Sequence, residues 1–304
     1  MKDKPVRDLG ASVRARLSRL ARERGEDFQS VLTRYANERF LFRLASSVYA
    51  QRFVLKGASL FSVWTGRPHR ATRDLDLLGF GDLEEEVVRQ IFAEVLAVDV
   101  PDDGVRFGSG TLVVGLIREE QEYGGVRLEF VARVTNAKVR LQVDVGFGDA
   151  ITPEAATIDY PTLLESPAPQ LRAYPRETVV AEKLEAMVRL GMANSRLKDF
   201  YDLFVLARDF DFDGESLVRA IRATFERRKT PLPVVLPVAL TKDFAEDPMK
   251  KSQWSGFVRK SGVEAADSLT ETIEAVALFV GNPLMAASGG TAYVARWHAP
   301  GPWN

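Results

Sequence analysis

Apolar residues recur at helical spacing over residues 11–24, and again from residue 28 to about residue 47. The apolar stripe of the first segment consists of Val13, Leu17, Leu20 and Ala21. Arginines occupy most of the positions between these residues, and Gly25 interrupts the pattern. Apolar residues three or four positions apart lie on one face of a helix. We therefore predict that residues 1–52 form an N-terminal element of two helices that pack on the following part of the chain.

The pattern changes to alternation after residue 52, which is typical of β-strands. Alternating or β-branched segments cover residues 111–117, 125–134 and 138–147, and an amphipathic helix is predicted over residues 83–98. In the last strand Asp144 shares the polar face with Arg140 and Gln142. Asp144 is either a site carboxylate or a solvated acid on an edge strand. We predict a mixed α and β core (class α+β) over residues 53–160.

The remaining chain reads as helical after an irregular, proline-rich stretch. Residues 153–175 are predicted to be a linker, because prolines and polar residues interrupt any periodicity. Helices are predicted from Pro175 onward, including residues 214–228, 239–258 and 263–280, and they define a C-terminal helical domain over residues 161–284. Residues 285–304 are small and polar with scattered aromatic residues. We expect this tail to be poorly ordered or to pack as coil.

Composition limits the chemistry that the chain can carry out. Its 304 residues include no cysteine and two histidines, and the net charge is −1. Disulfides, thiolate zinc sites and cysteine nucleophiles are excluded, so a metal would be a hard, oxygen-bound ion such as Mg²⁺. No apolar run reaches the roughly 20 residues that span a bilayer. The first residues lack an apolar signal region, so we expect a cytoplasmic protein without membrane contact.

The strongest chemical signal lies between residues 54 and 79. Small residues follow a short apolar run in the segment Lys56-Gly57-Ala58-Ser59, where a backbone could approach a phosphate closely. Asp74 and Asp76 alternate with leucines downstream, so both carboxylates face one side of a predicted strand. Two adjacent carboxylates repel unless a cation lies between them. The alternative is a loop that happens to be followed by two solvated acids.

The C-terminal helices contain a second group of charged residues. Lys183 lies beside the apolar stripe of one predicted helix, where it either extends from the core edge to solvent or is directed at a site. Asp199 and Asp202 lie three residues apart on one face of the next helix, after Lys198. A local ion-pair network and a carboxylate directed at a site are both compatible with this pattern.

Four segments in order resemble the AbiEii/AbiGii family of nucleotidyltransferase toxins, which includes the MenT proteins. The segments are LKGASLF with RATRDLDLL, LQVDVGFGD, ETVVAEKLEAM and SRLKDFYDLF. The resemblance covers about half the chain. It implies a DNA-polymerase-β-like nucleotidyltransferase sheet with flanking helices, followed by a helical domain. One departure is Gly57-Ala58, where the family often has two glycines, and alanine disfavours a positive φ.

The resemblance also implies roles for individual residues. Gly57 and Ser59, with Lys56 and Ala58, would hold the triphosphate of an NTP, and Arg73 would contact a phosphate. Asp74 and Asp76 would bind Mg²⁺, with Asp144 as a third ligand. Lys183 would contact the phosphates and Asp199 would be the remaining catalytic acid. Asp202 and Lys198 would support them.

The function implied by the resemblance is Mg²⁺-dependent transfer of a nucleotide from an NTP to an RNA, with the tRNA 3′ end as acceptor. Such a toxin would block translation, and an antitoxin would be its cognate partner. The arginines of the N-terminal helix and the C-terminal helices are where we expect RNA contacts, because phosphate binding requires clustered cations. Two alternatives stay open on sequence alone: NMP or phosphate transfer onto a protein, including the antitoxin, and a non-catalytic NTP-binding regulatory protein.

Overall fold

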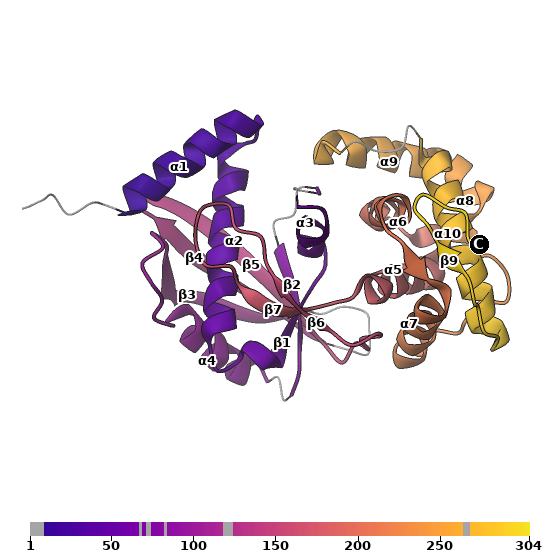
Figure 1. The fold of residues 1–304 in the computed structure, drawn as a ribbon, viewed down its shortest axis with the longest axis horizontal. Coiled ribbons are helices and arrows are strands. Elements are labelled where there is room, and N and C mark those ends of the chain that lie inside the picture. The colour runs from indigo at the N-terminus through magenta and orange to yellow at the C-terminus, as the bar shows by residue number, and fades with distance from the viewer. Residues whose placement is uncertain (1–8, 67–68, 71–73, 82–83, 118–123, 264–267) are drawn as a thin grey trace, which may run out of the picture. The chain divides into compact units, whose positions relative to one another are not determined.

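The structure is a computed structural model that describes residues 9–66, 69–70, 74–81, 84–117, 124–263 and 268–304 (Figure 1). The chain divides into two compact units. One unit contains residues 1–148 and 157–173, and the other contains residues 149–156 and 174–304. Arg73 lies outside the described residues.

A seven-stranded mixed sheet forms the centre of the first unit. Its helices are α1 (Leu9–Arg24), α2 (Phe28–Ser46), α3 (Ser59–Thr65) and α4 (Glu85–Leu96), with a 3₁₀ turn over Ala50–Arg52. Its strands are β1 (Phe53–Lys56), β2 (Asp74–Gly79), β3 (Arg106–Ile117), β4 (Gly125–Val134), β5 (Ala137–Phe147), β6 (Ala156–Asp159) and β7 (Gln170–Ala173). The spatial order of the strands is β3-β4-β5-β2-β1-β7-β6. Strand β2, which carries Asp74 and Asp76, lies between β1 and β5. It pairs antiparallel with β1 and parallel with β5.

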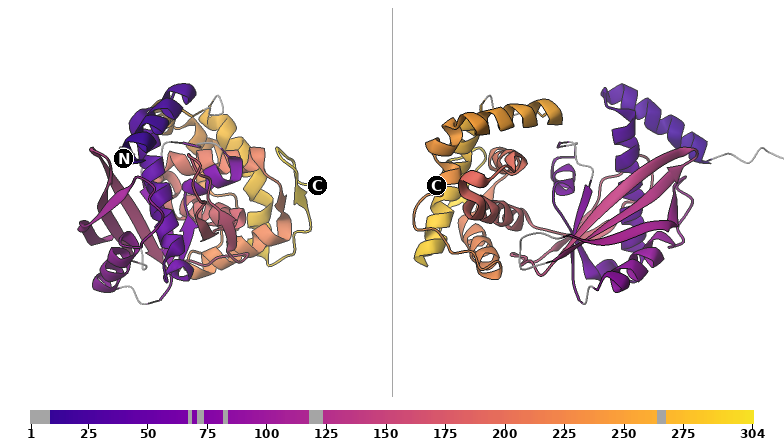
Figure 2. Two further views of the ribbon diagram at one scale, coloured as in Figure 1. Left: turned by 60° about the vertical axis from the view of Figure 1, so that its left-hand side comes forward. Right: turned by 180° about the vertical axis from the view of Figure 1, so that it is seen from behind.

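Helices cover one face of this sheet. The apolar residues of β5, Val139, Leu141, Val143 and Val145, are at most 2% exposed, and α2 packs against this strand. Helix α4 packs against β3 and α2. In Figure 1 helix α2 crosses in front of the sheet, and the view from behind in Figure 2 shows β3, β4 and β5 uncovered. The polar positions of these strands therefore lie on an open face.

Both predicted N-terminal helices are present, and buried charges fix the second one. Asp27 caps α2 by accepting a hydrogen bond from the Ser30 amide at 2.8 Å. Arg43 of α2 donates to both carboxylate oxygens of Asp103, at 2.7 and 3.2 Å, and both side chains are buried. A buried pair with two parallel hydrogen bonds fixes direction as well as charge. This contact therefore ties α2 to the loop that precedes β3.

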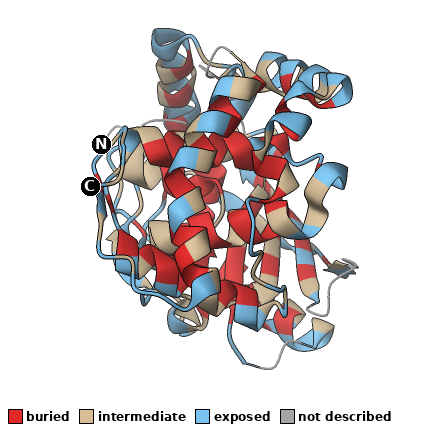
Figure 3. Cartoon of the chain, turned by 90° about the vertical axis from the view of Figure 1, so that its right-hand side faces the viewer, coloured by how far each residue is buried: buried red, intermediate tan, exposed pale blue. Residues whose placement is uncertain are grey.

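The second unit is helical. Its main helices are α5 (Arg176–Leu190), α6 (Leu197–Asp209), α7 (Gly214–Arg227), α8 (Lys242–Glu246), α9 (Pro248–Ser261) and α10 (Leu269–Gly289). Short 3₁₀ turns cover Gly191–Ala193 and Val238–Leu240, and β8 (Phe212–Asp213) pairs with β9 (Arg296–Trp297). Figure 3 shows buried residues alternating with exposed ones along these helices. In the parts of the chain that the structure describes, no helix is long and apolar enough to cross a membrane.

Two predictions about chain organisation are wrong. The stretch predicted as a linker contains β6 and β7, and β7 pairs in parallel with β1, where Leu55 is opposite Ala173. Short strands at a sheet edge have too few residues to show alternation among prolines. The single helix predicted over residues 239–258 is split, because Pro248 begins α9 and Asp247 caps it by accepting from the Lys250 amide.

Of the two alternatives expected for the tail, packing as coil describes most of residues 290–304, apart from the two-residue strand β9. Residues 285–289 continue α10, and Trp297 is 1% exposed. Its indole donates to the Ala207 carbonyl at 2.6 Å, and its ring lies 5.0 Å from that of Phe279. Scattered aromatic residues without periodicity have no recognisable pattern in sequence, yet they bury large apolar areas. The end of the chain therefore packs onto α6 and α10.

Candidate active site

A row of charged residues crosses the open face of the sheet. Lys56 of β1 is directly opposite Asp76 of β2, Asp76 is opposite Asp144 of β5, and Asp144 is opposite Arg127 of β4. Residues directly opposite one another on paired strands point to the same face. Four charged side chains from four strands therefore gather in one line, although they are up to 88 positions apart in sequence.

The alternation predicted for the acidic strand is confirmed. Leu75 and Leu77 are each 1% exposed, whereas Asp74 and Asp76 are half-buried on the opposite face. Asp74 is opposite Gln142 in the next row of the sheet. The apolar residues hold the strand in the core, and both carboxylates are directed to the open face.

The turn after β1 brings backbone against the Asp76 carboxylate. Gly57 has a φ of +76°, and a Cβ atom added there would lie 2.0 Å from Oδ2 of Asp76. Only glycine combines this conformation with so close an approach. Ala58 has φ −69°, so the alanine that departs from the family pattern adopts an ordinary conformation. Ser59 then begins α3, and its hydroxyl donates to the Lys56 carbonyl at 3.3 Å.

We expect Gly57→Ala to abolish most nucleotidyl transfer, because the added methyl would displace the Asp76 carboxylate. Gly66→Ala is a matched control, since Gly66 also has a positive φ (+69°) but no atom lies within 4 Å of its added Cβ. Both variants should lose roughly 1 kcal/mol of stability from the positive φ. The transfer rate of each variant tests the loss of activity, and the midpoint of urea unfolding tests the loss of stability. Equal transfer rates in the two variants would contradict a role for the Gly57–Asp76 contact.

Asp144 is held by Arg127 in an ion pair with two hydrogen bonds. The guanidinium Nε donates to Oδ1 at 2.9 Å and a terminal nitrogen donates to Oδ2 at 2.7 Å. Donation of these hydrogen bonds to the Asp144 carboxylate raises the pKa of Arg127 above its ordinary value, and the negative charges of Asp144 and Asp74 add to this shift. Arg127 was not among the site residues predicted from sequence. The alternation of β4 could have indicated it, because the apolar residues Val126, Leu128 and Phe130 leave Arg127 on the polar face of the strand.

The carboxylates fit a magnesium ion that is partly coordinated by substrate. Mg²⁺ in phosphoryl-transfer sites takes one or two protein carboxylates, with phosphates and water completing its six ligands. Asp74 and Asp76 lie two residues apart on one face and provide that number. Among the described residues no three acidic or histidine side chains are grouped closely enough to hold a metal without other ligands. The third-ligand role of Asp144 stays a prediction.

The second unit contains a separate buried charge cluster. Lys183 of α5 donates to Oδ1 of Asp199 and to Oδ2 of Asp202, each at 2.7 Å. The side chains of Asp199 and Asp202 are 1% and 0% exposed, and that of Lys183 is 12% exposed. Arg196 also donates to Asp199, at 2.6 Å. Of the two alternatives for Lys183, extension from the core edge to solvent is therefore wrong.

The charges around Asp199 keep it ionised. Burial acts to raise the pKa of this carboxyl, but the charges of Lys183 and Arg196 outweigh burial and leave the pKa below its ordinary value. Both aspartates are therefore partners of Lys183. Lys198 is exposed on the first turn of α6. Whether these residues contact a substrate stays a prediction.

Most of the chain, including both charge clusters, resembles known proteins. Residues 39–277 match the family model described as nucleotidyl transferase AbiEii toxin of the type IV toxin–antitoxin systems. No curated protein sequence matches the chain.

Two crystal structures from Helicobacter pylori are similar to the chain. JHP933 is 16% identical with a TM-score of 0.46, and the match covers 84% of this chain and 93% of that one. A chain assigned as a nucleotidyltransferase is also 16% identical, with a TM-score of 0.47 and coverages of 87% and 96%. The family model spans well over half of the present sequence, including both charge clusters. This chain belongs to the AbiEii family of nucleotidyltransferase toxins.

Proposed function

We propose that the protein transfers a nucleotide from a Mg²⁺-bound NTP to an RNA acceptor, the tRNA 3′ end, and thereby blocks translation. The observation that supports this proposal best is the contact between the Gly57 backbone and the Asp76 carboxylate, on the same face as Lys56. Such a turn brings a phosphate-binding backbone next to a metal-binding carboxylate. An NTP bound by both would have its triphosphate at the metal.

The turn residues bind the triphosphate in this proposal. Backbone amides of Gly57 and Ala58 and the Ser59 hydroxyl are donors that suit phosphate oxygens. Lys56 provides a positive charge on the open face, since its ammonium lies 4.0 Å from a Cβ added to Gly146 of β5. Arg73, outside the described residues, remains a proposed phosphate contact from the sequence.

Asp74 and Asp76 would hold Mg²⁺, with Asp144 as a further ligand. When bound, the metal neutralises charge on the triphosphate and on the departing pyrophosphate. The aspartates position the α-phosphate for in-line attack by the acceptor hydroxyl, and one of them can accept the proton of that hydroxyl. Arg127 holds Asp144 through two hydrogen bonds and thus limits how far this side chain can turn.

Lys183 would contact the phosphates, and its partners would position it. Asp199 and Asp202 fix the direction of the ammonium, since each accepts a hydrogen bond from it. In this proposal Asp199 contributes through Lys183, and Lys198 supports the same helix from its exposed side.

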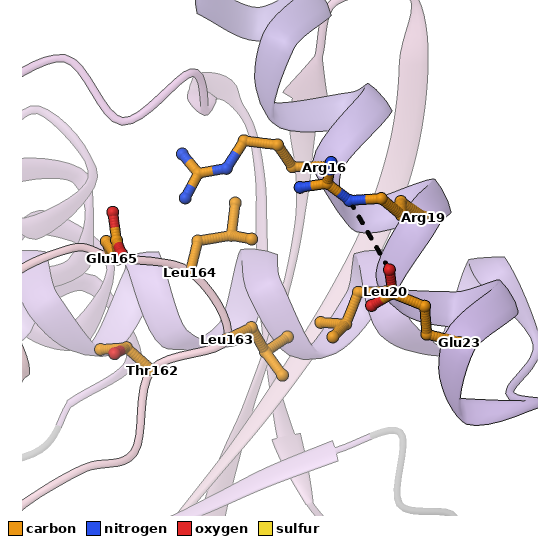
Figure 4. A pocket seen from close by; sticks show the side chains of 8 residues that line it. All are labelled: Arg16, Arg19, Leu20, Glu23, Thr162, Leu163, Leu164 and Glu165. Atoms are coloured by element: carbon orange, nitrogen blue, oxygen red, sulfur yellow. Dashed lines mark ion pairs between the residues drawn. The ribbon is translucent and has the colours of Figure 1, made fainter.

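An RNA acceptor is supported by the positive charge of α1. Arg16 and Arg19 line a hollow of about 640 Å³ between α1 and residues 162–165, together with Glu23 and Glu165 (Figure 4). Glu23 lies 3.8 Å from Arg19 and is itself exposed, so this pair adds little stability. The family belongs to toxin–antitoxin systems, which implies a cognate antitoxin as a protein partner.

The test is incubation of the purified protein with Mg²⁺, each α-³²P-labelled NTP in turn and total tRNA. The RNA and protein are then separated on denaturing gels, with Asp76→Asn as the inactive control. Label on tRNA that requires Asp76 supports the proposal and identifies the nucleotide. Label on a protein band alone, or no label with any NTP, would overturn the RNA acceptor.

A further inference from the structure

The open face of the sheet continues beyond the charged row. On β5 the side chains of Lys138, Arg140, Gln142 and Asp144 alternate with the buried valines and leucine, so all four share this face. The first two are exposed. They lie on the part of the strand that leads away from Asp76 toward the β4–β5 turn.

The neighbouring strands add two arginines at the same end. Arg133 of β4 is directly opposite Lys138, and Arg106 of β3 is directly opposite Arg133. Both are exposed. We call Arg106, Arg133, Lys138 and Arg140 the basic strip. Three strands therefore present four cations on one face, in register with one another.

The basic strip is not neutralised within the described part of the chain. None of its four side chains forms an ion pair or side-chain hydrogen bond with a described residue. Arg127, by contrast, is neutralised by Asp144 on the same face. The four strip cations differ from Arg127 in being available to an external anion.

Spacing along the strand suits a chain of phosphates. Successive residues on one face of a strand lie about 6.7 Å apart, so Lys138 lies about 20 Å along β5 from Asp144. A ligand that contacts Lys138 as well as the carboxylates is therefore elongated. A triphosphate alone is too short for this, whereas a polynucleotide is long enough and carries repeated negative charge.

We propose that the basic strip binds the phosphate backbone of the acceptor RNA and leads its end to Asp74 and Asp76. This inference rests on the proposed function, because it specifies where the acceptor of that reaction lies. The strip contacts phosphates and reads no base, so it contributes affinity without sequence preference. Specificity for one tRNA would come from other contacts.

The test compares two triple variants that remove equal charge. The strip variant carries Arg133→Gln, Lys138→Gln and Arg140→Gln. The control variant carries Arg219→Gln, Lys242→Gln and Arg296→Gln, which are exposed cations of the helical unit. Affinity for a short 5′-fluorescein-labelled single-stranded RNA is measured by anisotropy across a salt series, and thermal unfolding checks that each variant is folded.

Counterion release sets the expected effect. Each phosphate contact to a single strand contributes roughly a factor of four at about 0.15 M salt, so the strip variant should bind about 50-fold more weakly. The slope of log K against log salt should fall in magnitude by about 2. The control variant should keep the wild-type affinity and slope. Equal weakening of both variants would overturn the basic strip as a specific site.

A second measurement separates this inference from the proposed function. The KM for tRNA in the labelling reaction should rise in the strip variant with kcat nearly unchanged. An unchanged KM in an enzyme that labels tRNA would overturn the strip and leave the function intact. Strip-dependent RNA binding without any transfer would support the strip and overturn the function. If the strip variant lost binding to polyglutamate, and the wild-type protein did not bind RNA, the basic strip would be a surface for an acidic protein. That result would overturn the inference.

Discussion

Asp76→Asn is expected to lower the rate of nucleotidyl transfer by about 10³-fold or more. Metal stabilisation of the transition state is worth several kcal/mol, and each 1.36 kcal/mol is a factor of ten in rate. Asn keeps the shape of Asp but removes its charge, so the proposed Mg²⁺ would lose a ligand charge while the strand keeps its packing. Single-turnover labelling of tRNA at saturating NTP measures the effect, and thermal unfolding shows whether the fold is retained.

Two further variants sharpen this result. Asp159→Asn removes an exposed acid from β6, outside the charged row, and should keep the wild-type rate. Asp144→Asn tests the third-ligand role, because a ligand to the metal should show a loss close to that of Asp76→Asn. A small loss would instead leave Asp144 as the partner of Arg127. Wild-type activity in Asp76→Asn would refute the metal site.

Lys183→Met is expected to destabilise the native state by about 3–5 kcal/mol, because it leaves buried charge without its partner. Asp199 and Asp202 are almost fully buried and both depend on the Lys183 ammonium. Arg196 remains beside Asp199 and still offsets part of its charge. Urea unfolding followed by circular dichroism measures the change, and transfer activity is measured below the unfolding transition.

Stability and chemistry can be separated at this cluster. The triple variant Lys183→Met, Asp199→Asn and Asp202→Asn has no buried unpaired carboxylate, so it should recover much of the lost stability. It should nevertheless remain inactive, because the phosphate contact proposed for the Lys183 ammonium is lost. Recovery of transfer together with stability would show that Lys183 has a structural role only.

The site residues that could be predicted from sequence are those whose chemistry has a local pattern. Alternation of Asp74 and Asp76 with leucines indicated a strand with two carboxylates on one face, and the structure has that strand. The small residues after Lys56 similarly indicated a turn. Each inference required only neighbouring residues, because strand geometry repeats every two positions.

Residues brought together by strand pairing could not be predicted in the same way. Asp144 and Arg127 have the same alternation as many solvated strand residues, and only the register places them in line with Asp76. Register depends on the packing of the opposite, apolar face and on the turns. The short strand β7 was missed for a related reason, since its pairing with β1 is determined by distant contacts.

The path of the chain has a consequence for synthesis. The chain leaves the first unit after residue 148, returns for residues 157–173 and leaves again, so no single cut separates the two units. Strand β1 receives its neighbour β7 only after more than a hundred further residues have been made. Pairings between such distant segments form late, because the intervening loop must close first. A nascent chain therefore completes the sheet around Lys56 and Gly57 only when over half of its residues have been made.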